Sequence, residues 1–448
     1  MKKSFFILVL FVLLLSACAT TTNSTDKDET VEKKDSEATP EELESTIEET
    51  EEEQTDANIV TYSIQDMDVT PISEYPQDKW FKAEFPTDRE YYIVHNAIIE
   101  DNTYYIGSDR NKAVSYQANN LTANWSLDHK YGFDIELAID DMHLYSHTIG
   151  SPDNYNFIRA IDKQSGNVNY EIDLTGYGEF SEVSTDDGVL YMILGKMSDE
   201  ENIFADVFSL HAYDAKTGND LWSEEIDGLR MGERNGHYQI TSNESMIFYF
   251  EKDYKLVARS KEDGSERWST PFDDRLRFVQ AFIHHDQIYV LDRDYVFHVL
   301  NIDTGEVIDE IPYDGEAMGP EIANPIFIDN RIIMQHLDVE IDQHQIKGLD
   351  TENKEIAWIV DLDGYFAFGV EEVNGTIFAL LGDLDFDAEK PTRIAKINPE
   401  SGEIIEVIEL EEHMTPGKVN GYNRFTGHTV HDGVLSLSRN NILYGFYE

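Results

Sequence analysis

The stretch LHAYDAKTGNDLWSEEI, residues 210–226, contains a short apolar strand, a polar turn and a second strand that includes Trp222. Nearly the same phrase returns as IRAIDKQSGNVNYEIDL from Ile158 and as VARSKEDGSERWSTPF from Val257. A phrase that recurs at a regular period is typical of a structural unit that cannot bury its apolar face alone. The sequence therefore predicts a repeat fold.

The turn glycine of this phrase, and the aromatic residue four positions later, recur along the chain. The aromatic position falls at residues that are 41 to 52 positions apart: Trp125, Tyr170, Trp222, Trp268, Asp309, Trp358 and Glu406. The glycine is present as Gly166, Gly218, Gly264, Gly305 and Gly402, whereas Leu121 and Lys354 replace it in two copies. The chain therefore holds seven copies of a unit near 47 residues.

A second marker, a polar turn before an alternating strand, occurs upstream of each phrase. One example is STDDGVLYMIL around Asp187-Gly188, and such turns between period-2 strands indicate hairpins. This marker occurs eight times, once more than the first. The eighth hairpin runs into ILYGFYE without an aromatic strand of its own, and KWFKAEF supplies one, with Trp80 lying 45 residues before Trp125.

These counts predict an all-β fold, because each unit holds about four strands and no stretch shows a 3.6-residue period. An open array of such units would leave two sheet edges exposed, and a closed ring hides them. We therefore expect an eight-bladed β-propeller that the N-terminal strand closes.

The first residues read as a leader. An apolar run from Phe5 to Leu15 follows two lysines, and it is too short to cross a bilayer of roughly 30 Å. Leu15-Ser16-Ala17-Cys18 resembles the bacterial lipobox, in which the cysteine is lipidated and becomes the new N-terminus. We expect residues 1–17 to be a lipoprotein signal peptide and Cys18 to carry the acyl chains of a membrane anchor.

The next segment, residues 18–57, is acidic, nearly free of aromatic residues and too polar to form a core, so we expect a disordered tether. A sharper alternative is that its glutamate run, 48–53, binds cations or a partner. From residue 58 to 448 the composition becomes that of the propeller. Cys18 is the single cysteine, so the folded part holds no disulfide and no thiolate metal site. A net charge of −55 argues against nucleic acid as a partner.

The phrase AYDAKTGNDLW at 212–222 resembles the repeat of the quinoprotein-type propellers, the PQQ-like repeat family, and the likeness extends over residues 75–448. In that family the turn glycine and the tryptophan dock neighbouring blades. The resemblance therefore implies a structural, blade-docking role for Trp80, Trp125, Trp222, Gly218, Trp268, Gly264 and Trp358.

Two branches of that family give different expectations. The quinoprotein alcohol dehydrogenases hold a quinone over a tryptophan, usually against a vicinal disulfide, with calcium and an aspartate base. This chain has no cysteine pair and no long insertions between blades. The BamB-type lipoproteins of outer-membrane assembly share its lipobox, tether and eight blades without a cofactor, so we expect no cofactor. The longer, more acidic tether and the Lys-Lys-Phe-Phe leader differ from that branch and look like lipoproteins of Gram-positive bacteria.

Two acidic stretches deserve comparison with metal sites. Asp383, Asp385 and Asp387 open like a calcium loop, but the sixth-position glycine and the twelfth-position glutamate are missing, so a solvated loop is expected. On one straight strand, His336, Asp338, Glu340, Asp342 and His344 would share a face and could bind a transition metal, but a polar hairpin tip is the expected interpretation. His284 and His285 sit at a turn and should point to opposite faces.

The connections that are longest by this reading occupy equivalent positions in repeats 2, 3, 6 and 7, and we expect them to form one acidic rim with Tyr155, Phe157, Phe204 and Phe386. Loops on a rigid scaffold commonly carry binding sites. The sequence thus favours a monomeric, non-catalytic scaffold on the outer side of a cell membrane, with an envelope protein as partner. The alternatives are a quinone- or metal-dependent enzyme and a small-ligand sensor that uses the central channel.

Overall fold

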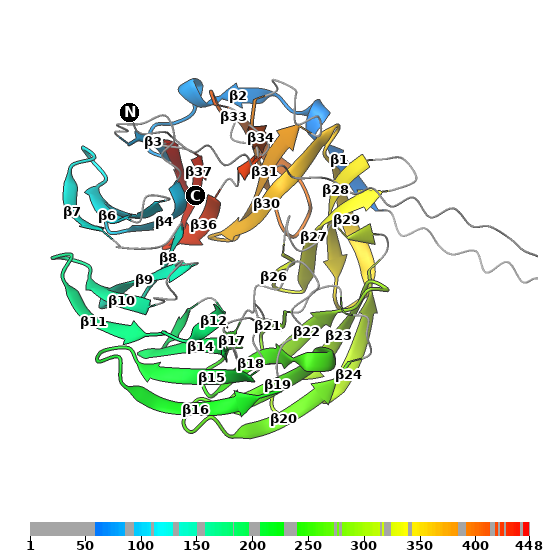
Figure 1. The fold of residues 1–448 in the computed structure, drawn as a ribbon. Coiled ribbons are helices and arrows are strands. Elements are labelled where there is room, and N and C mark those ends of the chain that lie inside the picture. The colour runs from blue at the N-terminus through cyan, green and yellow to red at the C-terminus, as the bar shows by residue number, and fades with distance from the viewer. Residues whose placement is uncertain are drawn as a thin grey trace, which may run out of the picture. The chain divides into compact units, whose positions relative to one another are not determined.

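The computed structural model describes residues 59–85, 94–108, 112–128, 134–149, 157–181, 183–196, 207–227, 240–272, 276, 280–313, 316–317, 324–338, 343–383, 391–412, 417–419, 422–424, 427–439 and 442–447. These residues form eight sheets that follow one another in chain order around a ring, plus one separate hairpin (Figure 1). The predicted all-β, eight-bladed propeller is confirmed. The helical elements of the described residues are single 3-10 turns, Ile64–Asp66 (η1), Ile72–Glu74 (η2) and Lys252–Tyr254 (η3), and none of them is long or apolar enough to span a membrane.

The first four blades are meanders of antiparallel strands that run from the centre of the ring to its rim. Blade 1 contains Val94–Glu100 (β4), Thr103–Ser108 (β5), Lys112–Gln117 (β6) and Ala123–Asp128 (β7). Blade 2 contains Asp134–Ile139 (β8), His143–Ile149 (β9), Phe157–Asp162 (β10) and Val168–Asp173 (β11). Blade 3 contains Tyr177–Phe180 (β12), Ser184–Asp186 (β13), Val189–Lys196 (β14), Val207–Asp214 (β15) and Asp220–Ile226 (β16). Blade 4 contains Thr241–Ser242 (β17), Met246–Glu251 (β18), Lys255–Ser260 (β19) and Glu266–Pro271 (β20).

The last four blades keep this order, with additions at the rim. Blade 5 contains Phe282–His284 (β21), Gln287–Leu291 (β22), Val296–Asn301 (β23) and Val307–Pro312 (β24). Blade 6 contains Glu316–Ala317 (β25), Ile326–Ile328 (β26), Arg331–Asp338 (β27), Gln343–Asp350 (β28) and Glu355–Asp361 (β29). Blade 7 contains Tyr365–Val373 (β30), Thr376–Asp383 (β31), Arg393–Ile397 (β32) and Ile404–Glu409 (β33). Blade 8 contains Gly427–His431 (β36), Val434–Arg439 (β37), Ile442–Tyr447 (β38) and, at its outer edge, Trp80–Glu84 (β3). The separate hairpin, between blades 7 and 8, pairs Gly417–Val419 (β34) with Tyr422–Arg424 (β35).

The ring is closed by both ends of the propeller. β3 pairs antiparallel with β38, from Trp80 opposite Phe446 to Glu84 opposite Ile442. The predicted closure by the N-terminal strand is therefore confirmed.

The turn between the third and fourth strands of a blade is built by its own side chains. In blade 3, Asp214 Oδ1 accepts hydrogen bonds from the backbone N–H and the hydroxyl of Thr217, each at 2.7 Å. These bonds hold the pKa of Asp214 below its usual value. Gly218 follows with a φ of +70°, which a residue with a side chain rarely adopts.

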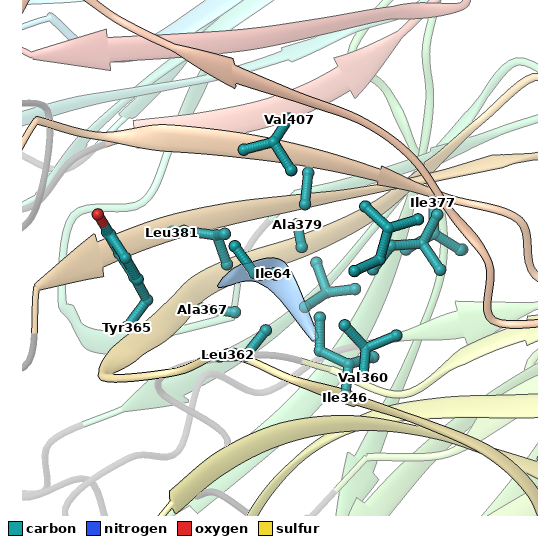
Figure 2. Close-up of a cluster of buried hydrophobic side chains, with 14 of the residues drawn as sticks. Ile64, Ile346, Val360, Leu362, Tyr365, Ala367, Ile377, Ala379, Leu381 and Val407 are labelled. Carbon is teal, nitrogen blue, oxygen red and sulfur yellow. The ribbon is translucent and has the colours of Figure 1, made fainter. Parts of the chain in front are cut away.

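Residues 59–75, here called the N-terminal belt, add two strands that the repeat pattern did not predict. Val60–Ser63 (β1) pairs in parallel with β29, and Val69–Pro71 (β2) pairs in parallel with β33. Ile64 is buried in the cluster that joins blades 6 and 7 (Figure 2). Ile72 and Tyr75 are buried in the cluster that joins blades 7 and 8. The belt therefore fills the rim on the side where the ring closes.

Candidate functional site

The aromatic residue and the glycine of the repeat meet across blade junctions. Trp222 of blade 3 lies against Gly264 of blade 4, where an added Cβ would come within 2.6 Å of its ring. Trp268 of blade 4 lies against Gly305 of blade 5 in the same way, at 2.3 Å. Both glycines have φ values of +70° or +72°. Each junction of this kind therefore needs a glycine for both its backbone conformation and its space.

The indole N–H groups of these tryptophans also cross the junctions. Each donates to the backbone carbonyl of a turn in the next blade: Trp125 to Lys163 at 2.9 Å, Trp222 to Lys261 at 2.9 Å, Trp268 to Ile302 at 3.0 Å and Trp358 to Pro399 at 3.0 Å. A partly buried indole N–H needs such an acceptor. The tryptophans of the repeat thus make contacts between blades, and one hydrogen bond fixes the orientation of each indole ring.

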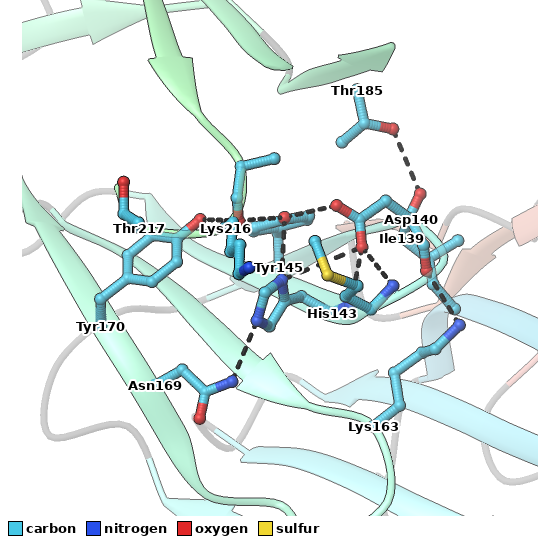
Figure 3. A network of polar contacts seen from close by, with 12 residues as sticks. Ile139, Asp140, His143, Tyr145, Lys163, Asn169, Tyr170, Thr185, Lys216 and Thr217 are labelled. Atoms are coloured by element: carbon cyan, nitrogen blue, oxygen red, sulfur yellow. Dashed lines mark hydrogen bonds and ion pairs between the residues drawn. The ribbon is translucent and has the colours of Figure 1, made fainter. Parts of the chain in front are cut away.

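The junction of blades 2 and 3 uses a tyrosine in place of the tryptophan, and a second tyrosine supports it (Figure 3). The Tyr170 hydroxyl donates to Ala215 O at 2.6 Å, and its ring lies 2.4 Å from the position of a Cβ on Gly218. The hydroxyl of Tyr145, within 3.0 Å of the same carbonyl, donates to Asp140 Oδ2 at 2.6 Å. The phenol of Tyr170, which is shorter than an indole, is thereby held in a polar network at the position where other junctions have a tryptophan.

The chemistry of this network is that of fixed hydrogen bonds. Burial, followed by the neighbouring carboxylate of Asp140, raises the pKa of Tyr145 far above its ordinary value. Burial also raises the pKa of Tyr170 to about 12. Both phenols therefore stay protonated at neutral pH and act as donors. His143 completes the network through a 2.9 Å contact between its Nε2 and Asn169 Nδ2.

The junction of blades 5 and 6 replaces both members of the docking pair. Asp309 stands where the repeat has tryptophan, Lys354 stands where it has glycine, and the two form an ion pair. Lys354 keeps the positive φ of the glycine, at +59°, and its Nζ also donates to Glu310 O at 3.1 Å. The hydrogen bond from Lys354 lowers the pKa of Asp309. The two substitutions in the sequence are therefore complementary in the structure.

Trp80 was predicted as the docking aromatic of blade 8, and the structure gives that position to the next residue. Phe81 pairs with Gly445 on β38, so close that a Cβ there would lie 2.0 Å from the phenyl ring. Phe81 stacks on Tyr104 of blade 1 with ring centroids 5.1 Å apart. The Trp80 Nε1–H instead donates to Tyr75 O of the belt at 3.3 Å. The expectation for Trp80 is therefore corrected by one residue.

Of the two interpretations of residues 336–344, the hairpin is confirmed and the shared metal-binding face is wrong, because β27 and β28 pair antiparallel. His336 on β27 is opposite Gln345, and His344 on β28 is opposite Leu337, which puts the two histidines on opposite faces of blade 6. Their ring contacts agree, since His336 lies near Tyr313 of blade 5 and His344 near Phe366 of blade 7. Glu340 and Asp342 lie outside the described residues.

His284 and His285 were expected to point apart, and this is also wrong. Their ring centroids are 4.0 Å apart, because His285 adopts a φ of +53° at the turn and folds back. His284 Nε2 lies 2.6 Å from Asp329 O and is engaged there. Asp383 ends β31, while Asp385 and Asp387 lie outside the described residues. Within the described ranges, no three His, Cys, Asp or Glu residues are grouped as a metal ion would need.

The other predicted residues are only partly covered. Cys18, Tyr155, Phe204 and Phe386 lie outside the described residues. Phe157 opens β10, and its ring carries the Arg159 guanidinium at 4.3 Å from its centroid.

A quinone held with calcium would require clustered oxygen ligands. In the part of the chain that the structure describes, no three His, Cys, Asp or Glu side chains form a metal-binding group, and the single cysteine cannot form a vicinal disulfide. The described residues therefore do not fit this cofactor.

Comparisons with known proteins agree on the fold. A family model described as outer membrane protein assembly factor BamB matches residues 206–440, just over half of the chain. No curated protein matches the sequence. Among solved structures, the computationally designed Ika8 protein is similar at 12% identity and a TM-score of 0.54, over 82% of this chain and 100% of that one.

Two natural proteins with solved structures are also similar. The quinohemoprotein alcohol dehydrogenase ADHIIG from Pseudomonas putida HK5 has 11% identity and a TM-score of 0.51, over 84% of this chain and 78% of that one. BamB from Moraxella catarrhalis has 15% identity and a TM-score of 0.47, over 70% of this chain and 93% of that one. At these identities the likeness to Ika8 and to ADHIIG shows the fold alone, and the family follows from the model match. The chain therefore belongs to the family of the outer membrane protein assembly factor BamB, built from PQQ-like repeats.

Proposed function

We propose that this protein is a lipid-anchored, non-catalytic propeller that binds a protein partner in the bacterial cell envelope. The observation that carries the proposal is the use of the repeat's signature residues. Tryptophans 125, 222, 268 and 358 lie at blade junctions, where each indole N–H has a carbonyl acceptor in the next blade. These residues thus make a rigid ring, and family membership supports a role in envelope assembly for that ring.

The anchor in this proposal is Cys18, which becomes the lipidated N-terminus after removal of residues 1–17. The acidic segment 18–57 then separates the membrane from the propeller. A flexible coil of that length spans roughly 35 Å on average, and self-repulsion lengthens it. The ring is thus held on the outer side of the membrane and at some distance from it.

The propeller has two different faces, and the lengths of their connections support the choice of one of them as the docking face. Short turns join first to second and third to fourth strands, so they all lie at one face, and β1 runs away from this face because it is parallel to β29, which begins there. The opposite face carries the longer connections, such as the one between β14, which ends at Lys196, and β15, which begins at Val207. We place the partner on this second face, where Tyr155, Phe204 and Phe386 belong to the connections and Phe157 opens β10 directly after one of them.

The test is crosslinking and affinity capture of the tagged, full-length protein from its own membranes, followed by mass spectrometry. We expect one envelope protein in a fixed ratio, and its loss when acidic residues of the long connections are replaced by lysine. Replacement of an equal number of acidic residues in the short turns is the matched control. If neither the reversal of charge on the long connections nor that on the short turns changes the capture, the proposed docking face is contradicted. If no protein partner is captured and the protein carries a stoichiometric quinone or metal, the alternative of a quinone- or metal-dependent enzyme is favoured.

A further inference from the structure

The outer strand of blade 5 closely matches the outer strand of blade 7 in sequence. Residues 306–312 read EVIDEIP, and residues 403–409 read EIIEVIE. Both stretches begin after the turn glycine of their repeat and form the last strand of their blade, β24 and β33. The two strands therefore present nearly the same edge.

One of these edges is covered and the other is open. β2 of the belt pairs in parallel with β33, and Ile404 is only 4% exposed, in a cluster with Met67 and Val69. No described strand pairs with the outer side of β24. The equivalent Val307 is 40% exposed there, and this is the difference between the two edges, because Ile308 at 50% and its equivalent Ile405 at 53% are exposed in both. β24 thus resembles β33 in sequence, but no described strand covers its outer edge as β2 covers that of β33.

The belt shows how such an edge is covered in this molecule. β1 and β2 are short, extended segments that add to β29 and β33 as parallel fifth strands. The outer edge of a blade is therefore able to receive a strand in this direction. An open edge with adjacent aliphatic residues is a template for pairing with another chain.

The charges near β24 indicate what kind of chain would pair with it. Glu306 and Glu310 are exposed, and Asp309 is compensated by Lys354. The protein as a whole carries a net charge of −55, and residues 18–57 are acidic, so a second copy or the tether would be repelled. An occupant with lysine or arginine beside its apolar residues would be attracted.

We propose that β24 binds an extended segment of a partner protein by parallel strand addition, and that this segment combines β-branched residues with basic ones. The proposal rests on the proposed protein-binding function and adds a second attachment point to the docking face described above. In this proposal the side chains of Val307 and Ile308 make the apolar contacts with the segment. Backbone hydrogen bonds to β24 fix the direction in which the segment runs.

The test uses the full-length protein and a fluorescent peptide whose binding is followed by anisotropy. The peptide has the sequence of residues 67–73, with lysine in place of Asp68 and one lysine added at each end. A second peptide is identical but N-methylated at alternate residues, which removes its ability to pair with a strand. Ile308→Lys is compared with Leu221→Lys, because Leu221 is 52% exposed and precedes the aromatic position of blade 3 as Ile308 does in blade 5.

We expect saturable binding of the first peptide, slower hydrogen exchange in residues 306–312, and no binding of the N-methylated peptide. Ile308→Lys should weaken binding by about tenfold or more, since it brings like charges together, and Leu221→Lys should leave it unchanged. No saturable binding, equal binding of the N-methylated peptide, or an equal effect of Leu221→Lys would overturn the proposal. If membrane capture still yields a partner after such a result, only the β24 site fails; if capture yields none, the proposed function itself fails.

Discussion

The blade junctions can be tested by adding a single methyl group at a turn glycine. A Cβ on Gly305 would lie 2.3 Å from Trp268 Cε3, in a backbone with a φ of +70°. Gly188 has nearly the same φ, +74°, but nothing lies within 4 Å of its added Cβ. Gly188→Ala therefore carries the backbone cost alone, and Gly305→Ala carries the backbone cost and the displacement of the tryptophan.

These two costs can be estimated separately. A non-glycine residue in the left-handed region costs roughly 1–2 kcal/mol. Overpacking a well-filled site costs about 1–3 kcal/mol more, and the ring that must move also donates its indole N–H to Ile302 O at 3.0 Å. We expect Gly188→Ala to lower the free energy of unfolding by roughly 1–2 kcal/mol and Gly305→Ala by roughly 2–5 kcal/mol.

The assay is urea unfolding followed by circular dichroism, with both variants measured against the parent protein. A double variant isolates the contribution of the indole, because Trp268→Ala should reduce the further cost of Gly305→Ala towards that of Gly188→Ala, with the 2.8 Å approach to Thr270 Oγ1 as the steric contact that remains. Equal costs for Gly188→Ala and Gly305→Ala in the parent, or no coupling between Gly305 and Trp268, would refute the steric docking of blades.

Three further predictions concern the remaining junctions. The ion pair with Lys354 holds the pKa of Asp309 below its unfolded value of 3.8, so its stabilisation is present above that pH and is lost as the pH falls through the lowered value. Asp309→Asn should therefore lower the free energy of unfolding by no more than about 1 kcal/mol at neutral pH, because the pair is partly exposed. The difference between variant and parent should vanish in acid. A difference that is the same in urea unfolding at pH 7 and at pH 3 would contradict this. Ile72→Ala should cost about 2–5 kcal/mol by the same assay, because the side chain is buried where the belt crosses blades 7 and 8, and a loss under 1 kcal/mol would mean that the belt does not support the closure. Tyr170→Phe should cost about 1 kcal/mol and Tyr145→Phe more, since the latter leaves the Asp140 carboxylate without its phenol donor; the reverse order would contradict the network.

The fold was predictable because its signals are local. A turn glycine, an aromatic residue four positions later and an upstream hairpin recur in one unit, and each follows from the chemistry of a few neighbouring residues. The closing strand was predictable as well, since the missing aromatic strand of the last repeat had one candidate, around Trp80. The belt was not, because its parallel strands β1 and β2 are four and three residues long and depend on partners about 300 and about 340 positions away.

The site residues show where spacing alone fails. A repeat step of 45 residues does not resolve one position, and in a strand a shift by one residue turns the side chain to the other face, which is why Phe81 and not Trp80 meets blade 1. The alternation between His336 and His344 left a single strand open beside the favoured hairpin tip, and only the pairing of β27 with β28 decides for the hairpin. Asp309 in place of tryptophan and Lys354 in place of glycine were visible in the sequence as two separate departures from the repeat. Only the structure shows that the two residues form an ion pair across one junction.

The most direct test of the central claim is native mass spectrometry of the full-length protein extracted from its host membranes. We expect a chain that begins at an acylated Cys18, free of quinone and metal, in a fixed ratio with one envelope protein. An intact complex of this composition would support an anchored scaffold. A chain that carries one quinone or metal ion per molecule and has no protein partner would contradict it and make the protein an enzyme.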